Sequence, residues 1–138
     1  MEDCIFCKII KGVLPCTKIY EDEKVLAFSD INPAVDGHVL VIPKAHTLDI
    51  WDISQDDLAA VHKASKIIAA AMKKAIPASG IICMQLNGSD VGQMVMHYHL
   101  HLIPCEAGSR LSHCDVRSGK GDSSKIKEIA EKIASAIS

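Results

Sequence analysis

The sequence predicts an α+β domain in which helices pack on one face of an antiparallel sheet of about five strands. Two observations predict this class. Short apolar segments of strand length recur between turn residues, and most are close enough in sequence for hairpin connections. A long amphipathic segment divides them into two groups, and a second one closes the chain. At 138 residues, the chain is expected to form a single domain over residues 1–138.

The expected elements follow in the order short helix, three strands, long helix, two strands and final helix. Apolar residues at four-residue intervals predict the short helix over residues 4–12. An N-cap at Ser54 followed by acidic residues and an apolar stripe predicts the long helix, which Pro77 ends. The final helix is expected at about 124–137, within a C-terminal extension over 105–138. The expected strands are 18–21, 25–28, 38–43, 81–86 and 95–104.

Composition and charge restrict the classes of partner. The formal net charge of −2 gives no electrostatic reason to expect nucleic-acid or membrane partners. No apolar run approaches the ~20 residues of a transmembrane helix, and the start Met1-Glu2-Asp3 lacks the basic residues of a signal peptide. Six cysteines without such a signal are expected to be reduced thiols or metal ligands. We therefore expect a cytoplasmic protein, with the nucleus as a second compartment.

Three histidines alternate with apolar residues in the predicted strand 95–104. Successive side chains of a strand point to opposite faces, so His97, His99 and His101 should form one row. The opposite, buried face would then hold Met96, Tyr98, Leu100 and Leu102. A half-buried strand can carry one histidine by chance, but three titratable groups in strict alternation contribute little to stability alone. The row therefore indicates a functional site for a phosphate-sized group or a metal.

A Cys-x-x-Cys pair, Cys4 and Cys7, lies in the predicted short helix. Such a pair can be half of a tetrahedral zinc site, a redox pair or a coincidence. A redox pair is expected after a strand of a βαβ unit, and no predicted strand precedes Cys4. Zinc is the better functional interpretation, although it needs two further ligands. The single cysteines Cys16, Cys83, Cys105 and Cys114 are interpreted as small buried residues or surface thiols.

A loop with two glycines, residues 87–93, comes directly before the histidine strand. Its backbone N–H groups could bind an anion. Hairpin connections have a similar composition, so the loop alone is a weak signal.

Several blocks of this chain together resemble the histidine-triad (HIT) family of nucleotide hydrolases and transferases. The resemblance covers residues 4–104 and is closest to the zinc-carrying, Hint-like branch. Its blocks are Cys4-Ile-Phe-Cys7-Lys-Ile-Ile, Phe28-Ser-Asp30-Ile-Asn-Pro33, Gly37-His38-Val-Leu-Val-Ile-Pro43-Lys-Ala-His46, Gly92-Gln93 and His97-Tyr-His99-Leu-His101. It implies a HIT-like fold that works as a homodimer, with the sheet continued across the interface.

The resemblance implies unequal roles for the histidines. The middle one, His99, would attack the α-phosphorus of an adenylated substrate and form a nucleotidyl-histidine intermediate, for which imidazole is suited. His101 would contact the phosphoryl oxygens or protonate the leaving group. His38 would support the triad from a neighbouring strand. The resemblance also implies a closed, structural zinc site made of Cys4, Cys7, His46 and His97.

The nucleotide site is likewise implied by the resemblance. Asp30 would accept hydrogen bonds from the ribose, although it could equally cap its own turn. Four apolar residues would form the walls around a purine base, although each could simply belong to the core: Phe6, Ile9, Phe28 and Ile31. The loop residues Asn87, Gly92 and Gln93 would hold the phosphate through backbone and side-chain groups.

The chain departs from the family pattern at three positions. Leu86 replaces an asparagine, with Asn87 one place later, and Met94 replaces a small hydroxyl residue after Gly92-Gln93. Both positions usually reach the phosphate or leaving group, and each such hydrogen bond contributes roughly 1.5–3 kcal/mol. Cys105 replaces an arginine that is common in other branches, which disfavours the dinucleoside-polyphosphate hydrolases.

The expected function is therefore hydrolysis of adenosine 5′-phosphoramidates, and of related acyl or phosphate bonds, with release of AMP. One alternative is a dinucleoside-polyphosphate hydrolase that uses the same His99. Another is a non-catalytic nucleotide-binding protein, which Leu86 and Met94 motivate. A zinc ion held by all three histidines is disfavoured, because two i, i+2 steps span ~13 Å.

Overall fold

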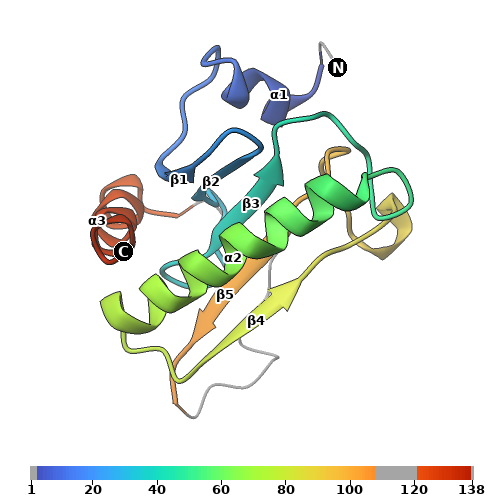
Figure 1. Cartoon of the computed structure of the whole chain (residues 1–138). Helices are drawn as coiled ribbons and strands as arrows, with labels where there is room; N and C mark the ends of the chain where they lie inside the picture. The colour runs from blue at the N-terminus through green and yellow to red at the C-terminus, as the bar shows by residue number, and fades with distance from the viewer. Residues whose placement is uncertain (1–2, 108–120, 138) are drawn as a thin grey trace.

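The computed structural model of the chain describes residues 3–107 and 121–137. Its strands form one antiparallel sheet in the order β1-β2-β3-β5-β4 (Figure 1). This architecture confirms the predicted α+β class. The strands are β1 (Lys18–Glu21), β2 (Val25–Ser29), β3 (Val39–Pro43), β4 (Gly80–Met84) and β5 (Leu100–Cys105). The helices are α1 (Ile5–Ile10), α2 (Gln55–Ala75), the 3-10 turn η1 (Ser89–Val91) and α3 (Ser123–Ser135).

Each face of the sheet has its own apolar cluster. The larger cluster joins α2 and α3 to the residues of β2, β3 and β5 whose side chains point to one face, such as Val39 and Val41. The smaller cluster joins Phe6 of α1 to the alternate residues, whose side chains point to the other face, such as Leu40 and Ile42. The two longer helices thus share one face, as predicted, whereas α1 packs on the opposite face. Figure 1 shows α2 lying across the sheet.

Both faces of the central strands are covered. Every residue of β2 and β3 is buried, which explains why 38–43 is an almost continuous apolar run in the sequence. The edge strand β4 is only partly covered, and Cys83 in it is exposed.

The predicted histidine strand is shorter than its pattern suggests. β5 starts at Leu100, so His97 and His99 precede it in irregular backbone. The N–H of Tyr98 donates to the carbonyl of Thr47 at 2.8 Å, which is a contact to a loop and not to a strand of the sheet. The strand predicted over 95–104 was therefore wrong for its first half, although Tyr98 still packs on the α2 face and His97 and His99 still contact Phe6 on the α1 face.

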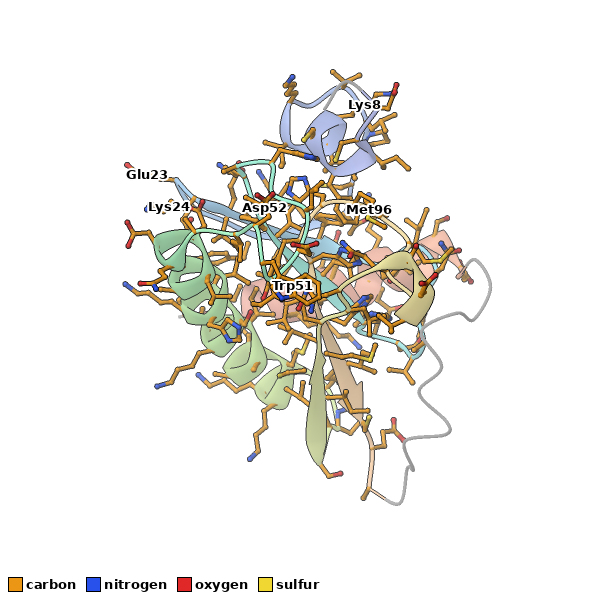
Figure 2. The ribbon with its side chains drawn as sticks, turned by 90° about the vertical axis from the view of Figure 1, so that its right-hand side faces the viewer. Lys8, Glu23, Lys24, Trp51, Asp52 and Met96 are labelled. Carbon is orange, nitrogen blue, oxygen red and sulfur yellow. The ribbon has the colours of Figure 1, made fainter. Side chains whose placement is uncertain are left out.

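The burial of this segment also differs from the prediction. The row of histidines is buried as deeply as the apolar row, because α1 covers it, and His97 is 0% exposed. Met96, which was expected in the buried row, is 43% exposed. Its side chain lies on the surface that faces the viewer in Figure 2, together with Trp51 and Asp52.

The long helix α2 has the predicted ends. The Ser54 side chain accepts from the N–H of Asp57, and the residue before Pro77 is extended, as proline requires. His62 is exposed on its outer side. The C-terminal helix α3 is two residues shorter at its end than predicted and buries Ile129, Ala130 and Ile133 against the sheet and α2.

Cys16 and Cys83 are exposed thiols, and β4 ends at Met84, two residues before its predicted end. Cys114 lies outside the described residues. Within the parts of the chain that the structure describes, no helix is both long and apolar enough to cross a bilayer.

Candidate functional site

A cavity of about 590 Å³ opens on the face of the sheet that α1 covers. We call it the α1 cavity. Its volume lies within the ~300–1,000 Å³ typical of small-molecule sites. Six residues singled out from the sequence line it: Phe6, Ile9, Phe28, Asp30, Ile31 and His99. The other lining residues are Ile5, Leu14, Pro15, Cys16, Ser29, Asn32, Leu40, Met94 and Val95.

The Phe6 ring is the centre of the apolar wall. It contacts Phe28 edge to face, with ring centroids 5.5 Å apart, and His99 in the same way at 5.2 Å. A third edge-to-face contact, at 5.8 Å, joins it to His97. One side chain of α1 therefore touches the cavity wall and two of the three alternating histidines.

His99 has one ring nitrogen bound and the other available. Its Nδ1 lies 2.7 Å from the carbonyl oxygen of His97, so Nδ1 carries the proton and donates it. In the neutral ring Nε2 then keeps its lone pair, and the side chain lines the α1 cavity. Burial lowers the pKa of His99, which favours the neutral ring at neutral pH. A neutral imidazole with a free Nε2 is a competent nucleophile.

His38 and His101 form a buried pair behind His99. The N–H of Ala34 donates to Nδ1 of His38 at 3.0 Å, so this nitrogen holds a lone pair and Nε2 holds the proton. Nε2 of His38 lies 2.9 Å from Nδ1 of His101 and donates to it. In neutral His101 the proton is therefore on Nε2. A single backbone N–H thus sets the tautomers of two histidines.

The same pair is neutral over most of the pH range. Burial first, and then the charge of neighbouring His99, lower the pKa of His38 to about 4. Burial, His99 and His38 lower the pKa of His101 to about 3. The ring centroids of His99 and His101 are 5.0 Å apart, so the pair is in direct contact with His99.

Asp30, His38 and His101 are close enough to hold a metal ion, but their hydrogen bonds argue against it. The Asp30 carboxylate lies 3.5 Å from Nε2 of His38. A metal on this Nε2 would force the His38 proton onto Nδ1, where it would face the N–H of Ala34. Two donors would then oppose each other in a buried place, which is costly. The three groups fit a hydrogen-bonded relay.

Asp30 caps its own turn and also lines the α1 cavity. Its Oδ1 accepts from the N–H of Asn32 at 2.8 Å, which is the turn contact. Burial raises the pKa of its carboxyl, and the residue lines the α1 cavity. The turn and a ligand contact are therefore compatible, because the carboxylate has a second oxygen.

The four predicted zinc ligands converge at the N-terminal end of α1. Nδ1 of His97 lies 3.4 Å from Sγ of Cys4 and 3.6 Å from Sγ of Cys7. Nδ1 of His46 lies 3.2 Å from Sγ of Cys7 and 3.3 Å from Nδ1 of His97. A tetrahedral zinc with ordinary bond lengths requires ~3.6 Å between sulfur and nitrogen and ~3.3 Å between two nitrogens. The donor atoms are thus spaced as a zinc ion needs.

The chemistry of these donors also fits a cation. Nε2 of His97 donates to the carbonyl of Pro43 at 2.8 Å, which leaves Nδ1 free to coordinate. Burial and the neighbouring Cys4 thiol raise the pKa of Cys7, so a positive ion would be needed to hold both thiolates. Four protein ligands leave no open position, which is typical of structural zinc. His99 and His101 take no part in this cluster.

The loop over 87–93 is held by its own side chains. Gln93 is 3% exposed, accepts from the N–H of Gly88, and donates to the carbonyls of Leu48 and Val95. Asn87 accepts from the N–H of Ile50 at 2.7 Å and pairs with Gln85. None of the predicted phosphate-binding residues Asn87, Gly92 and Gln93 lines the α1 cavity. Their described contacts organise the loop.

Two backbone donors that the sequence did not single out as donors belong to residues that line the cavity. Met94 and Val95 follow the loop and line the α1 cavity. Among the residues that the structure describes, their backbone N–H groups have no protein acceptor. Neither residue type suggests anion binding, because a backbone donor leaves no mark on the sequence. Ala34, whose N–H orders the histidine pair, was missed for the same reason.

The chain belongs to the HIT family: residues 11–108 match the HIT domain. The fold and the alternating histidines beside a cavity agree with that assignment.

Particular relatives extend the comparison to most of the chain. The "Protein hit" of Bacillus subtilis is 41% identical over 121 residues, which cover 88% of this chain and 75% of that protein. The "Adenylylsulfatase HINT3" of Arabidopsis thaliana is 39% identical over 74% of this chain, but only over 52% of its own length. A zinc-bound histidine-triad protein from Mycobacterium smegmatis superposes with a TM-score of 0.87, at 33% identity over 99% of this chain and 94% of that one.

Proposed function

We propose that this protein is a nucleotide hydrolase that cleaves the bond between the α-phosphate of an adenosine 5′-phosphoramidate and its amine, releasing AMP. The orientation of His99 carries the proposal: Nδ1 is bound to the His97 carbonyl, and the other nitrogen is available to the α1 cavity. The family assignment and the relative named an adenylylsulfatase support hydrolysis at an adenylyl phosphorus.

The reaction would proceed in two displacements. Nε2 of His99 attacks the α-phosphorus, the P–N bond breaks, and the amine leaves with the bonding electrons and takes up a proton. Water then attacks the phosphorus of the nucleotidyl-histidine, the N–P bond breaks, and AMP and neutral His99 are released. The N–H groups of Met94 and Val95 would donate to the phosphoryl oxygens, where negative charge develops.

His101 would act beside the nucleophile. Its Nε2–H can donate to a phosphoryl oxygen, because His38 occupies its Nδ1. Burial keeps His101 neutral in the free protein, and a proton on its Nδ1 would face the Nε2–H of His38. His101 would therefore act as a hydrogen-bond donor to the phosphoryl group, and the leaving amine would take its proton from water.

The nucleoside would lie in the apolar part of the α1 cavity. Phe6, Ile9, Phe28 and Ile31 would form walls around the base, and the second oxygen of Asp30 would accept from a ribose hydroxyl. The purine would thus lie under α1, and the phosphate would lie beside His99.

The Cys4, Cys7, His46 and His97 cluster would hold structural zinc. The donor spacing supports this, as does the relative described as zinc-bound. Bound zinc would supply a fixed crosslink between α1 and the histidine segment. These features favour the Hint-like, zinc-carrying branch.

The protein would act as a homodimer in which the sheet continues across the interface. Strand β4 is an edge strand with a partly covered apolar side, which supports pairing with a second copy. Light scattering of the purified protein tests this directly, and a monomer would contradict it.

The decisive experiment compares three substrates or ligands on the wild type and on His99→Ala. We expect release of AMP from adenosine 5′-phosphoramidate by the wild type alone, with slower turnover of diadenosine polyphosphates. Faster turnover of the polyphosphates would favour the alternative hydrolase. Equal, slow turnover by both proteins with retained AMP binding would favour a non-catalytic nucleotide-binding protein, which Leu86 and Met94 motivate.

A further inference from the structure

The segment before α3 is bound to the loop over residues 30–33. The N–H of Gly121 donates to the carbonyl of Ile31 at 2.9 Å. The next residue, Asp122, caps α3 by accepting from the N–H of Ser124 at 2.9 Å. The start of α3 is therefore fixed both to its own helix and to the loop.

Only glycine fits at position 121 without moving the loop. A Cβ atom there would lie 2.8 Å from both Cγ and Cδ of Pro33, and 3.1 Å from the Ile126 side chain. Gly121 is not among the glycines with positive φ, so its backbone would accept alanine. The restriction is steric, and the obstructing atoms belong to a rigid proline ring.

The loop has little space to yield on this side. The crevice between α3 and the loop has a volume of about 10 Å³ and is lined by Ile126 and Ile129 of α3 and by Asp30 and His38. Such a crevice holds about one water molecule. The loop is closely packed on this side, so a Cβ atom at position 121 would push Pro33 away from it.

The opposite side of the same loop faces the α1 cavity. Asp30, Ile31 and Asn32 all line it, directly before Pro33. Ala34 follows Pro33 and donates to His38. Two of the residues that would hold the nucleoside, Asp30 and Ile31, thus lie within three positions of Pro33.

We infer that Gly121, which lies beyond the matched HIT domain of residues 11–108, is a positioning residue for nucleoside binding. The contact of Gly121 with Ile31 and Pro33 sets the position of the ribose-side wall of the α1 cavity. This inference rests on the proposed function, because it requires that the cavity bind a nucleotide.

The test is a double-mutant cycle on Gly121→Ala and Pro33→Ala, with Ser123→Ala as a control. Ser123 is exposed at the first turn of α3, two residues from Gly121. Calorimetry measures the affinity for AMP. Assays with adenosine 5′-phosphoramidate give kcat and KM, and thermal melting tests folding. We expect Gly121→Ala to raise Kd and KM roughly tenfold, the order of effect of a methyl group inserted into a packed contact. We expect kcat to change less than about twofold, because neither His99 nor His101 belongs to the loop over residues 30–33.

The rescue identifies the contact. Pro33→Ala removes the two atoms that the new Cβ would meet, so the double variant should bind AMP more tightly than Gly121→Ala. Wild-type AMP affinity in Gly121→Ala would overturn the inference. So would a variant with lower kcat, higher KM and a lower melting temperature whose AMP affinity Pro33→Ala does not restore. If the wild type and Ser123→Ala neither bind AMP nor hydrolyse the substrate, the proposed function fails and this inference fails with it.

Discussion

The carbonyl oxygen of His97 accepts a 2.7 Å hydrogen bond from Nδ1 of His99, while the His97 ring turns away toward Cys4 and Cys7. His97 therefore belongs to two sites at once. Its ring completes the proposed zinc cluster, and its backbone sets the tautomer of the proposed nucleophile. Three alternating histidines that look equivalent in the sequence have different partners in the fold.

Replacing His99 by alanine should abolish hydrolysis of adenosine 5′-phosphoramidate. The loss should reach at least roughly a thousandfold, because no other group takes over covalent catalysis. Stopped assays of AMP release would measure it, and calorimetry should still detect AMP binding. His62→Ala, on the exposed side of α2, should behave as the wild type. Normal turnover by His99→Ala would exclude it as the nucleophile.

Removing the metal should lower both stability and nucleotide affinity. Elemental analysis should find zinc in the purified protein, and Cys4→Ser with Cys7→Ser should lose it and melt at a lower temperature. AMP affinity should fall as well, because Phe6 lies between these cysteines on α1 and lines the cavity. Cys83→Ser, at an exposed thiol, is the control. An unchanged melting temperature in the double variant would show that the cluster has no structural role.

Acid should destabilise the fold through the buried histidine pair. The pKa of His38 is about 4 in the fold and about 6.5 in an unfolded chain, so the unfolded state binds more protons between these values. The contribution is fully present above pH 6.5 and is lost as the pH falls toward 4. From pH 7 to pH 5 the unfolding free energy of the wild type should therefore fall by more than that of His38→Gln. The difference between the two falls should be roughly 2 kcal/mol. Urea titrations at both values measure this, with His62→Gln as the control, and equal losses would contradict it.

A hydroxyl at position 94 should speed turnover of small substrates. Met94 lines the α1 cavity and is 81% exposed, at the place where the family pattern has a small hydroxyl residue. Met94→Ser should raise kcat/KM for unsubstituted phosphoramidate roughly tenfold, the effect of one hydrogen bond to a charged group. Met96→Ser, at an exposed methionine that does not line the cavity, should have no effect. Equal rates in both variants would mean that position 94 does not reach the reacting groups.

Gln93 should be essential for the loop even though it does not line the cavity. Its amide donates to two carbonyls, those of Leu48 and Val95. In Gln93→Glu a carboxylate oxygen would replace the amide nitrogen, so that buried acceptors would face each other. This change should lower the free energy of unfolding by roughly 2–4 kcal/mol. Chemical unfolding at pH 8 measures this. Asp90→Asn, on the exposed side of the same loop, is the control. An unchanged unfolding free energy would show that the loop does not depend on this amide.

Much of the architecture could be predicted because it depends on local sequence patterns. The strands and α2 follow from apolar segments bounded by turn residues, from Ser54 as a cap and from Pro77 as an end. The predicted start of β5 was too early, because the alternation of histidines and apolar residues begins before the residues that pair with neighbouring strands. Tyr98 bonds to Thr47, and the His97 ring turns to the cysteines, and neither contact is local.

The sequence by itself determined which groups are chemically able to act: the alternating histidines, the cysteine pair and Asp30. Only the tertiary structure decided what each one does. The Ala34 N–H orders His38 and His101, the His97 carbonyl orients His99, and Gly121 supports the loop of Asp30 from the far end of the chain. All three contacts are made by backbone atoms, and the third also depends on the absence of a side chain at position 121. No residue pattern records them, because they depend on where the chain returns in space.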